Sequence, residues 1–171
     1  SHIGMGVIGT LCSALLSGTG VYMNGGMSPE EAVESAMLFT KDFNLFKEKN
    51  GLSNESKLTL FASPMFYKAI AANIDKYTDL SYLGTILSGG SKITKEEIDK
   101  VYDIFSTKGC NSKIVNAYGQ NEMNLTCCNS EKNNYIGTAG YPSIGTVIAI
   151  VDDNYELVEA GIEGRILEKS D

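Results

Sequence analysis

The stretch LGTILSGGSKITKEEI (residues 83–98) decides the fold, because it holds one complete strand-to-helix unit. Its first six residues are mainly apolar and β-forming, which predicts a strand over 83–88. The glycine-containing loop SGGS (88–91) follows, and Thr94 with Glu97 three residues later forms a capping box that begins a helix. A strand that enters a helix through a short glycine loop is typical of a sheet with parallel strands.

The same order of elements repeats on both sides of this unit. Upstream, a strand over 58–63 leads into a helix over 64–77, and downstream a strand is expected over 113–119. An earlier helix over 28–51 begins with a capping box at Ser28. Right-handed crossovers between such strands predict an α/β fold with a mainly parallel sheet flanked by helices.

After about residue 125 the sequence pattern changes from alternating strands and helices to short strands joined by turns. LTCC, GTVIAIVDD and GRILEKS indicate short strands joined by turns such as Asp153-Asn154, and we expect them to be antiparallel. The chain therefore divides into an α/β subdomain at 1–125 and a β-rich segment at 126–171, the start of a further subdomain.

The first ten residues contain the spacing G-x-G-x-x-G at Gly4, Gly6 and Gly9. In a dinucleotide-binding turn this motif follows a strand and precedes an acidic residue by about 20 positions. No strand fits before Gly4, and no carboxylate stands at that distance, so a dinucleotide-dependent oxidoreductase is a minor alternative. We expect instead a small-residue helix over 4–17 and a strand over 19–24.

The composition narrows the class of protein. The net charge is −7, with 21 acidic and 14 basic residues, which argues against non-specific binding to nucleic acid or to an anionic membrane. Four cysteines without a C-x-x-C pair, beside a single histidine, predict reduced thiols in a cytoplasmic protein and no zinc site. The longest apolar stretch, residues 3–16, is too short to span a bilayer.

Two unusual loops follow neighbouring strands, at 86–94 and at 116–124. Because parallel strands share one direction, both loops should lie at the same edge of the sheet, where such folds bind ligands. In the first loop, Gly89 and Gly90 let a flat ring or a phosphate approach the backbone. The bland alternative is an ordinary turn.

The second loop, NAYGQNE, offers more varied chemistry. Tyr118 can stack on a purine, and Asn121 can donate a hydrogen bond to a phosphate oxygen. Glu122 is an oxygen ligand suited to Mg²⁺, and a bound Mg²⁺ ion also contacts substrate phosphates. Taken alone, Tyr118 could equally be a core residue and Glu122 a solvated carboxylate.

Five stretches in this order resemble the adenylate-forming superfamily, which includes acyl-CoA synthetases, luciferases and the adenylation domains of peptide synthetases. DLSYLGTILSGGSKIT is similar to the family's serine-glycine-glycine segment, and NAYGQNE to its Tyr-Gly-x-Thr-Glu motif. The other three are SHIGMGVIGTLCSALLSGTGVYM, LFASPMFYKAI and IGTAGYPSIGTVIAIVDDNYELVEAGIEGRI. Together the resemblance covers essentially the whole chain.

The resemblance implies an ATP-dependent ligase and assigns roles to residues. Glu122 would bind Mg²⁺, Asn121 would contact the α-phosphate, and His2 would gate the site near the substrate carboxylate; these are the implied catalytic residues. The implied nucleotide-binding residues are Ser88, Gly89, Gly90, Ser91, Asn116, Ala117, Tyr118, Gly119, Gln120 and Asn121.

The implied reaction joins a small carboxylic acid to AMP and then transfers the acyl group to coenzyme A or another thiol. Asn121 stands where the family has threonine, which leaves open a relative that binds acyl or adenylate groups without catalysis. The family's phosphate loop and its lysine-bearing C-terminal domain have no match in this chain. We therefore expect the chain by itself to be inactive and its full-length parent to be the enzyme.

Overall fold

The computed structural model describes residues 12–18, 21 and 28–170. The helices are α1 (Ser13–Ser17), α2 (Pro29–Lys49), α3 (Pro64–Ala72), the short 3₁₀ helix η2 (Ile74–Lys76) and α4 (Lys95–Ser106). The strands are β1 (Leu58–Ala62), β2 (Leu83–Ser88), β3 (Lys113–Gln120), β4 (Asn124–Cys128), β5 (Tyr141–Pro142), β6 (Thr146–Val151) and β7 (Arg165–Ser170).

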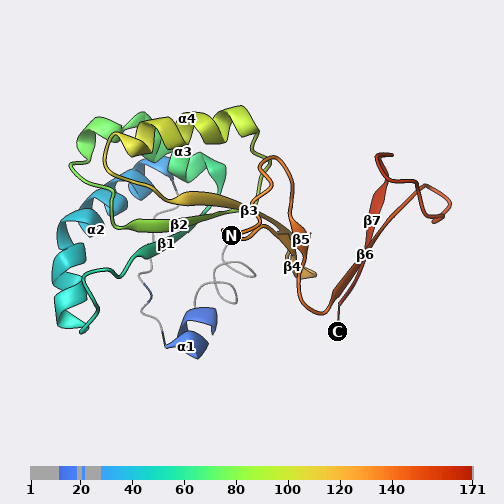
Figure 1. Ribbon diagram of the computed structural model, residues 1–171, viewed down its shortest axis with the longest axis horizontal. Helices are drawn as coiled ribbons and strands as arrows, with labels where there is room; N and C mark the ends of the chain where they lie inside the picture. The colour runs from blue at the N-terminus through green and yellow to red at the C-terminus, as the bar shows by residue number, and fades with distance from the viewer. Residues whose placement is uncertain (1–11, 19–20, 22–27, 171) are drawn as a thin grey trace.

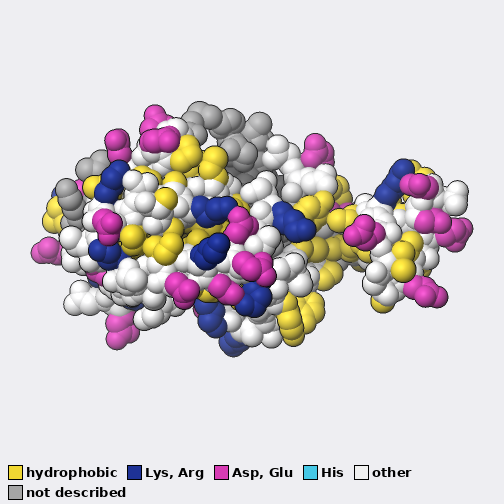
Figure 2. All heavy atoms as spheres, turned by 90° about the horizontal axis from the view of Figure 1, so that it is seen from above, with side chains coloured by type: hydrophobic (Ala, Val, Ile, Leu, Met, Phe, Trp, Pro, Cys, Tyr) yellow, Lys and Arg dark blue, Asp and Glu magenta, His cyan; other side chains and the backbone are white. Residues whose placement is uncertain are grey.

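One five-stranded sheet forms the body, in the order β1-β2-β3-β4-β5. β1, β2 and β3 are parallel, whereas β3, β4 and β5 are antiparallel to their neighbours. β6 and β7 form a separate antiparallel hairpin that extends away from the body (Figures 1 and 2). The predicted α/β class and the antiparallel C-terminal end are both confirmed.

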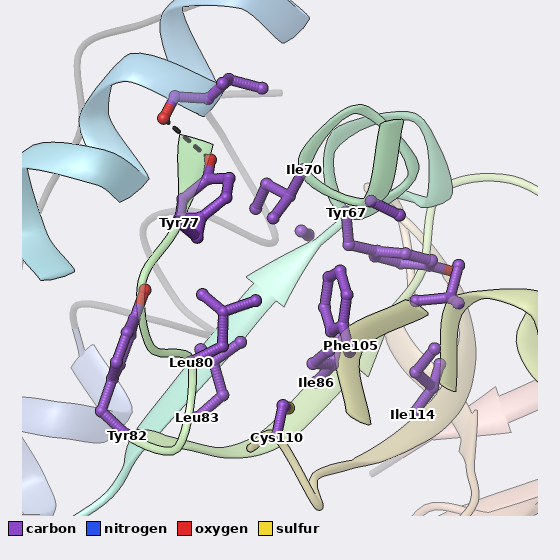
Figure 3. Packing of buried hydrophobic residues seen from close by; sticks show 14 of the residues in the cluster. Tyr67, Ile70, Tyr77, Leu80, Tyr82, Leu83, Ile86, Phe105, Cys110 and Ile114 are labelled. Carbon is purple, nitrogen blue, oxygen red and sulfur yellow. Dashed lines mark hydrogen bonds between the residues drawn. The ribbon is translucent and has the colours of Figure 1, made fainter. Parts of the chain in front are cut away.

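Helices α3 and α4 lie over one face of the sheet, and α2 packs beside α3 (Figure 1). The core lies between these helices and the sheet, where Tyr67 and Phe105 pack near Ile86 and Ile114 (Figure 3). Tyr67 is fully buried, and its hydroxyl meets the Ser88 hydroxyl at 2.9 Å. Burial of an aromatic ring stabilises the fold, and the hydrogen bond keeps the polar end satisfied.

The caps predicted from the sequence are present at both long helices. At α2, the Ser28 Oγ accepts from the Glu31 backbone N–H at 3.1 Å, and the Glu31 carboxylate accepts from the Ser28 N–H at 3.0 Å. Thr94 and Glu97 make the same reciprocal pair at the start of α4. These bonds satisfy backbone donors that a helix leaves free at its first turn.

The helix predicted over 64–77 is shorter than expected. α3 ends at Ala72, because the Asn73 side chain donates to the Ala69 carbonyl at 3.0 Å and competes with the helical pattern. The chain continues as η2 and then becomes extended at Tyr77, whose hydroxyl donates to the Val33 carbonyl at 3.0 Å (Figure 3). This break places Tyr77 in the core beside α2.

Several expectations concern residues that the structure does not describe. Of the helix predicted over 4–17, α1 (Ser13–Ser17) is described, and the strand predicted over 19–24 lies outside the described residues apart from Val21. In the part of the chain that is described, no helix has the length and apolar character needed to cross a membrane. The division at residue 125 stays a proposal; β4 straddles it and pairs with β3.

Candidate functional site

The two predicted loops lie at the same edge of the sheet. Ser88, the last residue of β2, is the register partner of Asn116 in β3. Beyond Ser88, the Gly89 N–H donates to the Ala62 carbonyl at 3.4 Å, so the end of β1 also reaches this edge. Gly90 has φ +83°, a left-handed conformation that favours glycine and turns the chain toward α4.

The four residues of the SGGS loop differ in exposure. Ser88 and Gly89 are buried, whereas Gly90 and Ser91 are exposed. The Ser88 hydroxyl faces Tyr67 of α3, and burial raises the pKa of Tyr67 to about 12, so this pair stays neutral. Ser88 thus fixes the start of the loop against the helices, and the exposed backbone and side chain after Gly89 face outward.

The stretch NAYGQNE comprises the end of β3, residues 116–120, and the start of the turn that leads to β4. β3 continues to Gln120, and Tyr118 pairs with Cys127 and Gly119 with Leu125 in β4. The register shift between these two pairs leaves Thr126 as an extra residue in β4, a β-bulge. β3 ends one residue beyond the strand predicted over 113–119, and its pairing with β4 was not predicted because the partner comes later in the chain.

Asn121 and Glu122 occupy the tip of this hairpin. The Met123 N–H donates to the Gln120 carbonyl at 3.3 Å, so both residues are the central pair of the turn. Both side chains are exposed. In the described part of the chain, the Glu122 carboxylate has no hydrogen bond or ion pair, so its oxygens are open to an incoming group.

Asn116 carries the least satisfied polar atom of this edge. Its amide nitrogen donates to the Thr138 carbonyl at 3.0 Å, whereas its Oδ1 is buried without a hydrogen-bond partner. A buried acceptor without a donor costs ~1–3 kcal/mol, which a ligand N–H can recover. Ala117 and Tyr118 beside it are half-buried, and the Gln120 amide donates to the Tyr118 hydroxyl at 2.8 Å.

A turn after β4 closes around Asn116. Gly140 has φ +88°, and a Cβ at this position would lie 2.2 Å from the Cys128 carbonyl carbon, so only glycine fits. This close approach lets the following residues pair with β4 as β5, and it holds Thr138 within reach of Asn116.

Comparison with known proteins identifies the family. The sequence model of a family described as AMP-binding enzyme matches residues 4–171. The chain belongs to the AMP-binding enzyme family. No curated protein sequence matches the chain.

Solved structures share the fold of this family member at low sequence identity. The anthranilate CoA ligase AuaEII, solved with anthranoyl-AMP, has a TM-score of 0.78 at 19% identity over 98% of this chain and 29% of its own. A benzoate CoA ligase from Burkholderia xenovorans LB400 has a TM-score of 0.72 at 18% identity, over 99% of this chain and 31% of its own. A luciferase-like enzyme from the nonluminescent mealworm Zophobas morio reaches 0.67 at 23%, over 98% of this chain and 36% of its own. This chain therefore spans about a third of these proteins or less.

Other sequence-predicted features lie outside the site as described. His2, the proposed gating residue, and Gly4, Gly6 and Gly9 fall outside the described residues. Among residues 12–18, 21 and 28–170, no group of three or more His, Cys, Asp or Glu side chains could hold a metal ion. A magnesium ion at Glu122 would therefore need further ligands from its substrate or from water, which is how Mg²⁺ is usually held.

One hollow in the described part of the chain lies away from the candidate site. It has a volume of about 510 Å³ and lies near Lys113, at the opposite end of β3 from Tyr118. Its lining residues are Tyr102, Ser106, Cys110, Asn111, Ser112, Lys113, Glu131, Lys132, Asn134 and Ile136. The groups expected to bind a nucleotide lie in the loops after β2 and β3, away from this hollow.

Two cysteine thiols lie close to the site, and their surroundings favour the protonated, unreactive form. Cys127 is the register partner of Tyr118, and Cys128 donates to the Asn129 carbonyl at 2.9 Å. Burial raises the pKa of both thiols, and the Glu168 carboxylate raises the pKa of Cys127 further. Both remain protonated near neutral pH, which leaves little thiolate for nucleophilic chemistry.

Proposed function

We propose that the full-length protein containing this chain activates a carboxylic acid with ATP and forms an acyl-adenylate. The family match supports use of an adenine nucleotide, and the loops at the ends of β2 and β3 supply suitable binding groups. The observation that carries the proposal is the buried, unpartnered Asn116 Oδ1 beside the Gly89-Gly90 turn. An adenine exocyclic amine is a donor that matches this acceptor.

The proposed nucleotide-binding residues are those that the family resemblance implies, and they lie at this edge of the sheet. Gly89, Gly90 and Ser91 would lie along the adenine, and Ser88 would hold their turn in place through Tyr67. Asn116, Ala117 and Tyr118 would flank the base from β3, with the Tyr118 ring excluding water. Gly119 and Gln120 continue the strand toward the phosphates, and the Gln120 amide steadies the Tyr118 hydroxyl.

The hairpin tip would hold the phosphates. Asn121 would donate from its amide to an α-phosphate oxygen, and the open Glu122 carboxylate would bind Mg²⁺. Bound there, Mg²⁺ would neutralise negative charge on the phosphate oxygens. Because both residues are central in one tight turn, their positions are coupled by the backbone. We propose that His2 gates the acyl side of the site.

The proposed chemistry has two steps. In the first, a carboxylate oxygen of the substrate attacks the α-phosphorus, a new P–O bond forms, and pyrophosphate leaves. In the second, a thiol attacks the acyl carbon, the C–S bond forms, the C–O bond to AMP breaks, and the thiol proton passes to solvent. Two structural neighbours are CoA ligases by description, which supports coenzyme A as the acceptor.

The same comparisons bear on where the rest of the site comes from. Because the chain spans 29% and 31% of those two ligases, we infer that the phosphate loop and the C-terminal lysine domain are supplied by residues outside it. We therefore expect the isolated chain to be inactive. A cytoplasmic location is also proposed, and the free thiols of Cys12, Cys110, Cys127 and Cys128 support a reducing compartment.

A second candidate is a relative that binds an acyl-adenylate without making one. The asparagine at position 121 favours it, because a longer, planar amide replaces the hydroxyl that the resemblance leads us to expect. The two candidates differ in turnover and share nucleotide binding.

Pyrophosphate exchange separates them. The full-length protein is incubated with labelled pyrophosphate, Mg²⁺-ATP and a panel of fatty, aromatic and amino acids. Incorporation of label into ATP that depends on one of the acids is the expected result. If no acid promotes exchange, and Asn121→Thr does not restore it, the ligase proposal fails, and ATP binding measured on the same sample then decides for the non-catalytic relative.

A further inference from the structure

A second buried amide side chain, that of Asn129, lies next to Asn116 and shares its hydrogen-bond acceptor. Asn129, which follows β4, is only 3% exposed. Its Oδ1 accepts from the Tyr135 backbone N–H at 2.9 Å, and its amide nitrogen donates to the Thr138 carbonyl at 3.0 Å. The Asn129 backbone N–H also donates to the Asn116 carbonyl at 2.9 Å. Both side-chain ends and the backbone of Asn129 are therefore engaged.

These contacts fix which way the Asn116 amide points. The Thr138 carbonyl can only accept, so the group that Asn116 directs toward it must be the amide nitrogen. The same reasoning orients Asn129, because the Tyr135 N–H can only donate to the Asn129 oxygen. The unpartnered Asn116 Oδ1 is then necessarily the end that faces away from Thr138.

We propose that Asn129 is a positioning residue that keeps the Asn116 amide nitrogen on Thr138 and its buried oxygen unpartnered, and so selects a nucleotide whose base offers an N–H donor at this point. The proposal rests on the function proposed above, with Asn116 beside the base. A 6-amino purine presents an amine to Asn116 Oδ1, whereas a 6-oxo purine presents a carbonyl oxygen against it. A free amide could rotate and accept either base; an amide locked by Asn129 and Thr138 cannot.

The position of Asn129 in the structure favours this role over general packing. The side-chain amide nitrogens of Asn116 and Asn129 both donate to the Thr138 carbonyl, so one acceptor serves both amides. If Asn129 lost its donor, the Thr138 carbonyl would be held by Asn116 alone, while the Tyr135 N–H would keep its bond to the side-chain oxygen at position 129. With one of its two side-chain donors gone, the Thr138 carbonyl would hold the Asn116 amide less firmly in this orientation.

The test compares binding of ATP and ITP, which differ at the exocyclic group of the purine. Dissociation constants are measured by titration calorimetry with Mg²⁺ on the full-length protein. We expect the wild type to prefer ATP by about 10-fold or more, because the wrong base leaves a buried acceptor unpaired. Asn129→Asp keeps the side-chain volume but replaces the donor by an acceptor, so the preference should fall by at least about 5-fold, mainly through weaker ATP binding.

The matched control is Asn133→Asp, the same substitution in the same loop at an exposed side chain, and it should leave the ATP-to-ITP ratio unchanged. Asn129→Ser, which adds no charge, is measured alongside in case the aspartate variant fails to fold. Equal weakening of ATP and ITP in the folded Asn129 variant would mean a purely structural role, and a wild type without preference for ATP would equally overturn the proposal.

The outcome is separable from that of the proposed function. A wild type that binds ATP selectively but never exchanges pyrophosphate would refute the ligase and leave the positioning role standing. A wild type that exchanges label into ATP and ITP equally well would do the reverse.

Discussion

At the residue scale, the proposed role of Glu122 as a Mg²⁺ ligand can be tested directly by substitution. Glu122 is at the tip of a tight turn, open to solvent and free of partners in the described part of the chain. Glu122→Gln keeps the shape and removes the charge that would bind Mg²⁺. We expect kcat/KM for Mg²⁺-ATP in the full-length protein to fall by about 10- to 100-fold, with the thermal midpoint unchanged.

The control for this substitution is Glu163→Gln, at another exposed carboxylate, which should leave the kinetics as they are. Titration of Mg²⁺ at fixed ATP distinguishes a metal ligand from a general charge effect, since only the loss of a ligand shifts the Mg²⁺ dependence. Unchanged kinetics in Glu122→Gln would make this residue a surface carboxylate.

Tyr67 gives a second prediction at this scale, through alkaline pH. Burial raises its pKa from 10.0 to about 12, so the folded protein keeps the hydroxyl proton that the unfolded chain releases near pH 10. Its contribution to stability is complete below pH 10 and is lost as the pH rises toward 12, by about 2 to 3 kcal/mol. Tyr67→Phe should lower stability at pH 8, because the buried Ser88 hydroxyl loses its partner, but should show a smaller further loss at pH 11.

Urea unfolding of the full-length protein at the two pH values measures this difference, with the exposed Tyr155→Phe as the control. A drop between pH 8 and pH 11 that is the same in wild type and Tyr67→Phe would show that ionisation of Tyr67 is not coupled to unfolding.

At the element scale, the capping boxes show local sequence deciding local structure. The Thr94 hydroxyl accepts from the Glu97 N–H at 3.2 Å and so begins α4 just beyond the SGGS loop. Thr94→Ala removes this bond and should destabilise α4 by ~1 kcal/mol. A lower urea midpoint than in Thr78→Ala, an exposed threonine outside any helix, is the expected result.

If Thr94→Ala and Thr78→Ala unfold at the same urea concentration, the cap contributes nothing measurable. Because α4 directly follows the SGGS loop, hydrogen exchange at residues 88–97 should also rise in Thr94→Ala if the cap anchors that loop.

Elements set by local signals could be predicted from the sequence, and elements set by distant partners could not. The caps at Ser28 and Thr94, and the strand at 83–88, were predicted because the deciding residues lie within a few positions of one another. The end of α3 at Ala72 was not predicted. The apolar helix pattern does not show that the Asn73 side chain will donate to the Ala69 carbonyl and compete with the helical hydrogen bonds. The strand predicted over 113–119 is confirmed as β3, but its antiparallel pairing with β4 was not predicted.

The candidate site divides in the same way. The sequence placed the loops after 88 and 116 at one edge because parallel strands share a direction, and the register of Ser88 with Asn116 confirms it. Asn129 and Thr138 gave no signal, because their contacts to Asn116 span 13 and 22 residues. An asparagine in a polar loop looks the same whether it is buried against a strand or solvated.

At the scale of the whole molecule, a side-chain hydrogen bond in the described part of the chain joins the two sheets. The Thr126 hydroxyl, in the bulge of β4, donates to the Glu168 carboxylate of β7 at 2.7 Å. Thr126 is fully buried, and the second Glu168 oxygen is buried without a partner. The β6–β7 hairpin otherwise projects from the body (Figure 2). Apolar side chains of this hairpin, such as Val147 and Leu167, are exposed. A two-stranded hairpin is marginally stable alone, so this bond should hold it in place.

We therefore expect Glu168→Ala to loosen the hairpin selectively. Hydrogen exchange followed by mass spectrometry on the full-length protein should show faster exchange in β6 and β7 and unchanged exchange in β1 and β2. Glu168→Gln retains an oxygen for the Thr126 hydroxyl and should exchange close to wild type, and Glu159→Ala, at an exposed carboxylate between β6 and β7, is the control.

A double-mutant cycle that combines Glu168→Ala with Thr126→Val should return a coupling free energy of about 1 to 2 kcal/mol. If Glu168→Ala and Thr126→Val have strictly additive effects, the two sheets are held together by other contacts, and the bulge at Thr126 serves the β3–β4 hairpin alone.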